Sequence, residues 1–250
     1  MIASLPMYKR PELIGAHNRF WQLIRTALAE RGISSPKILS QDADEFSTWN
    51  NPALVLSQTC GLPYRTELQN NVSLIGTPDY GLDGCPKGYY QSALVVRKGD
   101  KRTSLIDFKG AIFALNQHRS QSGYAAAYQH LRSCGYWFQH ELRTGAHMRS
   151  AQAVADKRAD IASIDAVSWR LMTQYDAFAD NLRVLDWTVP TPGLPFITAL
   201  AGTNDEIFSS IEQAISTLEE SDRQQLGLLG LTWIPKEDYL AVPTPKISSF

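Results

Sequence analysis

The sequence predicts an α/β fold of two lobes, because strand-like and helix-like segments alternate and two extended segments divide the chain. Short apolar runs are followed by longer segments whose apolar residues recur every three or four positions. This alternation is typical of mostly parallel sheets flanked by helices. The extended segments at 92–97 and 183–187 are interpreted as crossings between the lobes. We therefore expect residues 1–94 and 186–250 to form lobe 1, and residues 95–185 to form lobe 2.

The composition predicts a folded chain and argues against two classes of function. Of the 250 residues, 44% are hydrophobic and 20% are charged, which favours a packed core over disorder. The net charge is −1 and no long basic run occurs, so we expect no nucleic-acid partner. No apolar stretch is long enough to cross a bilayer, so we expect no membrane insertion.

Lobe 1 begins with a strand and a long helix. Residues 2–5 form a short apolar run that predicts the first strand. A helix is expected from about residue 11 to residue 31, because four apolar residues share one face and Gly32 follows as a stop signal. The four residues are Phe20, Trp21, Ile24 and Leu28.

Three more strands of lobe 1 are expected before the first crossing, each a short apolar run bounded by turn residues. They are residues 37–39, 53–57 and 72–76. A short helix is expected at Pro63, since proline is favoured in a first helical turn.

The end of the chain returns to lobe 1. Residues 196–201 predict a further strand after the second crossing. Two capping-box patterns then predict where the last helices begin. They are Thr203 with Glu206, and Ser221 with Gln224.

Lobe 2 repeats the alternation of strand and helix three times. Its expected strands are residues 111–115, 140–143 and 160–164, and its expected helices are residues 123–132, 150–157 and 166–172.

The segment between the first strand and first helix of lobe 2 predicts an anion site. It reads Ser120-Gln121-Ser122-Gly123-Tyr124. The first N–H groups of a helix have no internal partner and lie at the positive end of its dipole. The two serines can add hydroxyl donors, and Gly123 would let a ligand approach the backbone. The alternative is that Ser122 is an ordinary N-cap.

Several segments, taken in order, resemble one protein family. They are residues 3–8, 57–64, 89–97, 120–124, 144–150 and 159–165. Their order and spacing resemble the substrate-binding proteins of phosphate and phosphonate ABC transporters, the PhnD-like family, over about residues 2–200. The resemblance implies a type II periplasmic-binding-protein fold, whose two lobes close on a ligand in the cleft between them.

Ligands of open α/β sheets bind at the carboxyl ends of strands, so the candidate residues follow strands. In lobe 1 they are Tyr8, Gln58, Thr59 and Cys60, and in lobe 2 they are Ser120, Ser122, Gly123, Tyr124, His147 and Asp165. Alternatives stay open for three of the first group. Tyr8 can be a surface aromatic residue, and Gln58 and Thr59 can cap the helix at Pro63.

Two residues of lobe 2 carry a specific chemical expectation. His147 lies in a segment that resembles the family's Gly-Gly-His stretch, and a protonated imidazole there would complement an anion and titrate near neutral pH. Asp165 either caps the helix that begins at Ala166 or accepts from an amino or hydroxyl group of the ligand.

Three classes of function compete. The favoured one is a solute-binding protein for a small anionic or zwitterionic ligand, phosphate- or phosphonate-like, without covalent chemistry. An ABC-transporter permease or a regulatory protein would be its partner. The second is a cytoplasmic ligand sensor or adaptor. The third is an enzyme of pyrimidine-precursor-synthase type that reuses the fold, with Cys60 as the plausible nucleophile.

Cysteine usage and the start of the sequence bear on location and cofactors. Pro6 interrupts the first apolar run, so no signal peptide is visible and a cytoplasmic protein is expected, or a periplasmic one if the sequence is a trimmed mature form. Cys60 and Cys85 are expected to lie close enough on lobe 1 to interact, reduced in the cytoplasm. No metal-ligand spacing occurs, and neither metal nor cofactor is expected.

Overall fold

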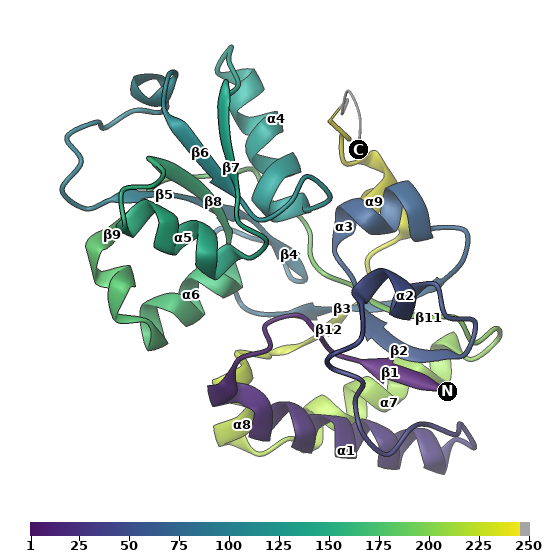
Figure 1. Cartoon of the computed structure of the whole chain (residues 1–250). Helices are drawn as coiled ribbons and strands as arrows, with labels where there is room; N and C mark the ends of the chain where they lie inside the picture. The colour runs from purple at the N-terminus through teal and green to yellow at the C-terminus, as the bar shows by residue number, and fades with distance from the viewer. Residues whose placement is uncertain (246–250) are drawn as a thin grey trace. The chain divides into compact units, whose positions relative to one another are not determined.

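The chain folds into two compact units in a computed structural model that describes residues 1–245 (Figure 1). Unit 1 comprises Met1–Tyr89 and Pro192–Ala241, and unit 2 comprises Tyr90–Thr191 with residues 242–245. The short strands β4 (Tyr89–Tyr90) and β10 (Thr191–Pro192) pair where the chain passes from one unit to the other. The lobe boundaries predicted at 94/95 and 185/186 fall a few residues away, inside strands of unit 2.

Unit 1 is a five-stranded sheet in the order β1-β2-β11-β3-β12. The strands are β1 (Ile2–Ser4), β2 (Leu54–Gln58), β3 (Ser73–Asp79), β11 (Phe196–Thr198) and β12 (Gly230–Thr232). The helices are η1 (Pro11–Leu13), α1 (Ile14–Glu30), α2 (Glu45–Trp49), α3 (Gly61–Pro63), η2 (Tyr64–Leu68), α7 (Asn204–Thr217), α8 (Glu220–Leu226) and α9 (Lys236–Ala241). β1 and β2 are parallel, whereas β11 is antiparallel to both β2 and β3. β2 and β3 therefore point the same way, and their carboxyl ends share one edge.

Unit 2 is a five-stranded sheet in the order β7-β6-β8-β5-β9. The strands are β5 (Ser92–Arg97), β6 (Ile112–Leu115), β7 (His140–Arg143), β8 (Ile161–Asp165) and β9 (Leu182–Trp187). The helices are η3 (Leu105–Phe108), η4 (Gln121–Ala125), α4 (Ala126–Ser133), α5 (His147–Ala155), α6 (Ala166–Tyr175) and η5 (Ala177–Asn181). β6 is parallel to β7 and β8, but β5 is antiparallel to β8 and β9.

The alternation of strands and helices is confirmed, and the sheets are mixed. The strands that follow one another with helical connections run parallel. β5 and β11 each enter their sheet after a crossing, and they run antiparallel to their neighbours because no helical crossover precedes them. β5 and β9, interpreted from sequence as crossings, pair with each other inside the unit 2 sheet, with Ala93 opposite Trp187.

Helix α1 shows how the apolar pattern becomes a buried face. The four residues predicted to share one face are all buried, and α1 packs against α7. The chain leaves the helix at Gly32, which has a φ of 75°, a conformation that favours glycine. Beside this contact, Arg19 forms a two-pronged ion pair with Asp222 of α8 at 2.5 and 2.6 Å.

Two local predictions for unit 1 are wrong. Residues 37–39 form no strand, although Ser40 N–H donates to Ala3 O of β1 at 2.8 Å. Helix α8 begins at Glu220 with Glu219 at the N-cap, so Ser221 lies inside the helix and cannot cap it. For α7 the predicted cap residue Thr203 is in place, but its side chain makes no cap hydrogen bond.

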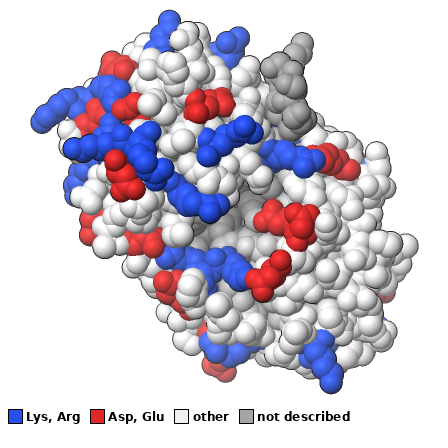
Figure 2. All heavy atoms as spheres, in the orientation of Figure 1, with Lys and Arg blue, Asp and Glu red and all other residues white. Residues whose placement is uncertain are grey.

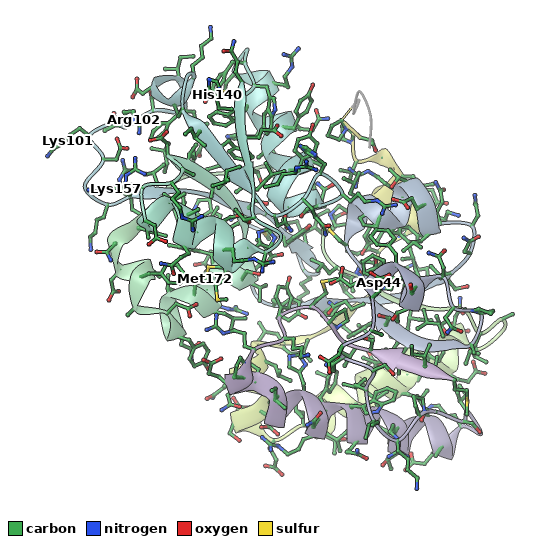
Figure 3. All side chains as sticks on the ribbon, in the orientation of Figure 1. Asp44, Lys101, Arg102, His140, Lys157 and Met172 are labelled. Carbon is green, nitrogen blue, oxygen red and sulfur yellow. The ribbon has the colours of Figure 1, made fainter. Side chains whose placement is uncertain are left out.

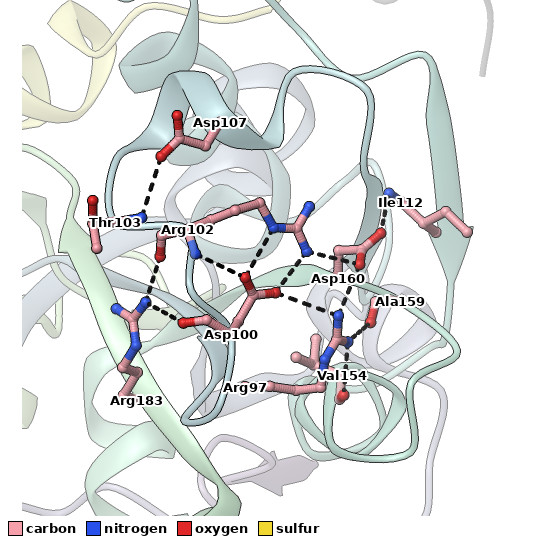
Figure 4. Close-up of polar contacts among 10 residues, drawn as sticks. All are labelled: Arg97, Asp100, Arg102, Thr103, Asp107, Ile112, Val154, Ala159, Asp160 and Arg183. Carbon is pink, nitrogen blue, oxygen red and sulfur yellow. Dashed lines mark hydrogen bonds and ion pairs between the residues drawn. The ribbon is translucent and has the colours of Figure 1, made fainter.

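A charged network closes the amino edge of the unit 2 sheet (Figure 4). The Asp100 carboxylate accepts from Arg102 Nε and Nη2 at 3.0 and 2.6 Å, and Asp160 accepts from Arg97 and Arg102 at 2.8 and 3.0 Å. The Arg183 guanidinium donates to the Arg102 carbonyl at 2.6 Å. Figure 2 shows Lys and Arg gathered among Asp and Glu over this part of unit 2, where Figure 3 labels Lys101, Arg102 and Lys157.

Replacing Asp100 with asparagine should lower the free energy of unfolding by about 2 kcal/mol at pH 7. The Asp100 side chain is only 9% exposed, and its hydrogen bonds with Arg102 lower the pKa from 3.8 to about 2. Because the folded pKa is depressed, this stabilisation is complete above about pH 4 and is lost as the pH falls toward 2. Chemical denaturation at a series of pH values from 7 to 2.5 measures this loss. The free energies of unfolding of wild type and Asp100→Asn should converge as the pH falls.

Asp156→Asn is the matched control, because Asp156 is 44% exposed and lies 3.5 Å from Arg158. Exposed pairs of this kind contribute about 0–1 kcal/mol. If Asp100→Asn and Asp156→Asn lower the free energy of unfolding equally, the network contributes no more than a surface ion pair.

Among residues 1–245, no helix is both long and apolar enough to cross a membrane. In the same residues, no group of three or more His, Cys, Asp or Glu side chains is placed to hold a metal ion.

Candidate functional site

The carboxyl edge of the unit 2 sheet gathers polar residues from five strands. β6, β7 and β8 run parallel and end together, so Asn116, Thr144 and Asp165 come to one edge. β5 runs the other way and begins there, with Ser92 paired to Asp165. Thr188 N–H donates to Ser92 O at 3.0 Å, which adds the end of β9 to the same edge.

The helix over this edge is capped by Ser120. The Ser120 backbone is extended. The Ser120 Oγ accepts from Gly123 N–H at 2.9 Å, and the Ser120 carbonyl accepts from Ala125 N–H at 3.0 Å. The sequence alternative placed the cap at Ser122, and that is wrong because the helix starts two residues earlier, with a π-helical turn. The Gly123 N–H, expected to face a ligand, is already bonded to the cap.

Ser122 is held between two neighbouring segments. Its Oγ lies 2.9 Å from His147 Nε2, at the start of α5. Its carbonyl accepts from the Ser163 hydroxyl of β8 at 2.5 Å. Ser122 itself is 4% exposed. The hydroxyl is therefore fixed in position by contacts that lie far away in the sequence.

His147 is neutral at pH 7 in this arrangement. Burial lowers its pKa from 6.5 to about 4, and the Ser163 backbone opposes that change only in part. The expectation of an imidazolium that titrates near neutral pH is therefore wrong for this structure. The physical reason is desolvation, which disfavours the charged ring. A neutral imidazole can still orient Ser122 through the hydrogen bond between them.

Acid should destabilise the folded chain through His147. Because the folded pKa lies below 6.5, stability is complete above pH 6.5 and is lost as the pH falls toward 4, at about 1.4 kcal/mol per pH unit. His147→Gln removes this dependence, which denaturation curves at pH 7.5, 6, 5 and 4.5 would reveal. His140→Gln, at an exposed histidine of the same unit, should keep the wild-type slope. If the free energies of unfolding of wild type and His147→Gln depended on pH in the same way, the burial argument would be contradicted.

Gly123 has a role that differs from the one predicted. A Cβ atom built on it would lie 1.9 Å from Asn116 Oδ1 and 3.2 Å from His147 Cε1. The side chain of Asn116 therefore occupies the space beside the Gly123 backbone that was assigned to a ligand. Glycine is needed here because any larger residue collides with Asn116.

Three buried polar atoms at this edge have no hydrogen-bond partner among residues 1–245. They are Ser92 Oγ, Asn116 Oδ1 and His147 Nδ1. Buried polar groups are almost always paired, so atoms left unpaired in one place indicate a bound water or ligand. Ser92 and Asn116 were missed from sequence. Their signal is position: Asn116 directly follows β6, and Ser92 opens β5.

The side chains of Tyr124 and Asp165 have structural roles. The Tyr124 ring is 6% exposed and packs edge-on against Trp137 at 5.5 Å and His118 at 4.7 Å. Burial raises its pKa to about 12. Asp165 Oδ1 accepts from Ser168 N–H at 2.9 Å, which makes it the N-cap of α6, as one alternative proposed.

The residues predicted in lobe 1 lie at the carboxyl edge of the unit 1 sheet. Tyr8 follows β1 with a φ of 61°, and its ring meets the Tyr80 ring edge-on at 5.2 Å. Gln58 Nε2 donates to Leu194 O at 2.9 Å and to Tyr80 Oη at 3.4 Å. Tyr8, Gln58 and Tyr80 are thereby brought together, and Tyr80 was not among the chosen residues.

A small cavity lies beside these tyrosines. It has a volume of about 20 Å³, enough for about one water molecule. It is lined in part by Tyr8, Gln58, Tyr80 and His17. Both ring nitrogens of His17 are buried without a hydrogen-bond partner among residues 1–245, and burial lowers the pKa of its ring.

Thr59 and Cys60 begin the short helix α3. Thr59 is fully buried, and its N–H donates to Pro195 O at 3.1 Å. Cys60 occupies the N-cap position, so neither Gln58 nor Thr59 caps this helix. Among residues 1–245, neither Cys60 nor Cys85 forms a disulfide bond, and burial raises the pKa of Cys85 to about 11. Their direct interaction stays a prediction.

Two α/β units joined by paired crossings, with polar strand ends in each, define the class of type II periplasmic-binding-protein folds. The chain belongs to the family described as "ABC transporter, phosphonate, periplasmic substrate-binding protein", whose family model matches residues 56–238. No curated protein matched the chain in the sequence comparison.

Solved structures with low sequence identity share this fold. A binding protein component of an ABC phosphonate transporter from Pseudomonas aeruginosa is 16% identical, with a TM-score of 0.70 over 96% of this chain and 82% of that one. PhnD1 from Prochlorococcus marinus in complex with methylphosphonate is 14% identical, with a TM-score of 0.70 over 95% and 94%. A Xanthomonas citri protein bound to ATP is 16% identical, with a TM-score of 0.69 over 95% and 92%.

Proposed function

We propose that the chain captures a small phosphonate or phosphate anion at the carboxyl edge of the unit 2 sheet. The observation that carries the proposal is that two buried hydroxyl groups, those of Ser120 and Ser122, lie at the start of a helix on this edge, at the positive end of its dipole. Family membership and the PhnD1 complex with methylphosphonate support the ligand class.

Each donor of this site follows from the contacts already described. Ser120 Oγ accepts from Gly123 N–H, so its own proton is left to donate to an oxyanion. We infer that His147 Nε2–H donates to Ser122 Oγ, which likewise leaves the Ser122 proton for the ligand. The helix dipole favours negative charge at the same point. Hydrogen bonds to a charged group contribute about 1.5–3 kcal/mol each.

The site binds its ligand without covalent chemistry. Ser122 and His147 form a pair that in a hydrolase would be nucleophile and base. However, no carboxylate orients His147 Nδ1, which has no partner among residues 1–245. With a pKa of about 4, His147 is also a weak base at neutral pH. The pair is therefore suited to holding an anion and not to attacking it.

Other parts of the proposal concern the ligand's second contact and the partner. Because Asp165 caps α6, the structure gives no reason for the ligand to carry an amino group, and a plain anion is proposed. Tyr8 and Gln58, at the carboxyl edge of the unit 1 sheet, stay proposed ligand-binding residues. A transporter permease is the proposed partner. The family is described as periplasmic, and the cytoplasmic location expected from sequence stays a prediction.

Calorimetry with a panel of probes tests the proposed function. Methylphosphonate and inorganic phosphate should bind, and methyl acetate, a neutral ester of similar size, should not. Incubation of methylphosphonate with the protein should release no inorganic phosphate or methane. Absence of heat with both anions would refute the binding function, and turnover would refute its non-catalytic form.

A further inference from the structure

A second polar groove lies at the amino edge of the unit 1 sheet. In the unit 1 sheet, β3 runs from Ser73 to Asp79, antiparallel to β11 (Figure 1). Ser73 at the start of β3 and Thr198 at the end of β11 pair with each other, and both line the groove. The groove has a volume of about 590 Å³. That falls within the range of about 300–1,000 Å³ typical of small-molecule sites. Tyr8 and Gln58 lie at the opposite edge, so this groove is separate from the residues described above.

Side-chain amides form much of the lining. Gln69, Asn70 and Asn71 follow η2 on one side, and Asn204 lies at the start of α7. Trp233 lies on the β12 side and is 56% exposed. An amide presents both donors and acceptors, which matches a hydroxyl group that both donates and accepts. The indole supplies an apolar face beside them.

The Asn204 amide points to an occupant of the groove. Its Oδ1 atom is buried and has no hydrogen-bond partner among residues 1–245. An amide oxygen can only accept, so whatever fills this position must donate a hydrogen bond. Leaving a buried acceptor unpaired is unfavourable, so pairing it favours binding.

The charges of the groove favour a neutral occupant. Lys236 Nζ already donates to the Gln69 carbonyl at 2.7 Å. Among the described lining residues none is acidic, so a cation finds no counter-charge. An anion would meet the Asn204 oxygen, and the acidic side chains of Asp205 and Glu206 in the first turn of α7 offset the positive end of that helix dipole. A neutral molecule with several hydroxyl groups fits both the donors and the acceptors.

We propose that this groove binds a neutral, polyhydroxylated molecule of about disaccharide size. Hydroxyl groups pair with Asn204 Oδ1 and with the amides of Asn70 and Asn71, and the ring carbons of the ligand rest on Trp233. This second site is independent of the proposed anion site, and its ligand does not compete with a phosphonate.

An NMR titration of the full chain with sucrose as the probe tests the proposal. The Trp233 indole N–H and the Asn70, Asn71 and Asn204 side-chain amides should shift together and saturate at millimolar sucrose. Trp233→Ala should weaken binding at least tenfold, and Asn204→Ala should do the same. Because Trp233 is largely exposed, its substitution leaves the fold intact. Trp187→Ala, at a 38% exposed tryptophan of unit 2, is the matched control and should bind as wild type does.

Two outcomes would overturn the proposal. One is a shift that stays linear in sucrose concentration, or none at all. The other is saturation unchanged in both Trp233→Ala and Asn204→Ala. Methylphosphonate added to the sucrose-saturated protein should leave the sucrose shifts in place, so failure at one site is distinguishable from failure at the other.

Discussion

Alanine at position 123 should weaken methylphosphonate binding at least tenfold, because the new Cβ atom collides with Asn116. That Cβ atom would lie 1.9 Å from Asn116 Oδ1, so either that side chain or the start of the helix must move. Overpacking of this kind costs about 1–3 kcal/mol of stability. The displaced helix would carry Ser120 and Ser122 away from the ligand. Calorimetry measures the loss of affinity, and thermal melts measure the stability.

Two further variants separate this collision from a general effect of alanine. Gly110→Ala adds a Cβ to the same unit where no heavy atom lies within 4 Å, and it should bind as wild type does. Asn116→Ala combined with Gly123→Ala removes the colliding atom and should recover part of the affinity. A double-mutant cycle gives the coupling between the two positions. Independent effects of the two substitutions would show that Asn116 is not the cause.

Removing both serine hydroxyls should weaken binding by roughly ten- to a thousand-fold, since each bond to an anion contributes about 1.5–3 kcal/mol and about 1.4 kcal/mol is tenfold. Ser120→Ala/Ser122→Ala leaves the backbone of the helix in place. Loss of the Ser120 cap costs only about 1 kcal/mol, so the variant should fold. Calorimetry with methylphosphonate measures the effect, with thermal melts beside it.

Ser133→Ala is the control for this pair. Ser133 lies at the far end of the same helix and donates to the His130 carbonyl, away from the carboxyl edge of the sheet. Its removal should leave affinity unchanged. A folded Ser120→Ala/Ser122→Ala protein with wild-type affinity would reduce the segment 120–124 to a helix start without a binding role.

Local sequence patterns predicted most helices and strands of the fold. The β7 segment 140–143 was predicted with its observed bounds, and α1 was predicted with four of its six buried residues, because each pattern is local. Residues 37–39 failed because a short apolar run becomes a strand only where a neighbour pairs with it. The crossings were placed too far inside unit 2, because extended residues in sequence do not reveal that β5 and β9 pair with each other.

The proposed anion site was predicted from the sequence, but the contacts within it were not. The predicted strand, the two serines and Gly123 located the start of the helix in unit 2. The partner of Ser122 comes from α5, and the atom that requires Gly123 comes from the end of β6. These contacts join residues that are far apart in the chain, so no spacing in the sequence predicts them. The same is true of the His147 pKa, which depends on burial and not on the neighbouring sequence.

The most direct test of the binding claim is an NMR titration of the full chain with methylphosphonate. We expect saturable shifts of the backbone amides of residues 120–124 and of the His147 ring, and in Ser120→Ala/Ser122→Ala the same shifts should require at least tenfold more methylphosphonate. Saturable binding that leaves residues 120–124 and His147 unmoved would contradict the proposed site, and so would no binding.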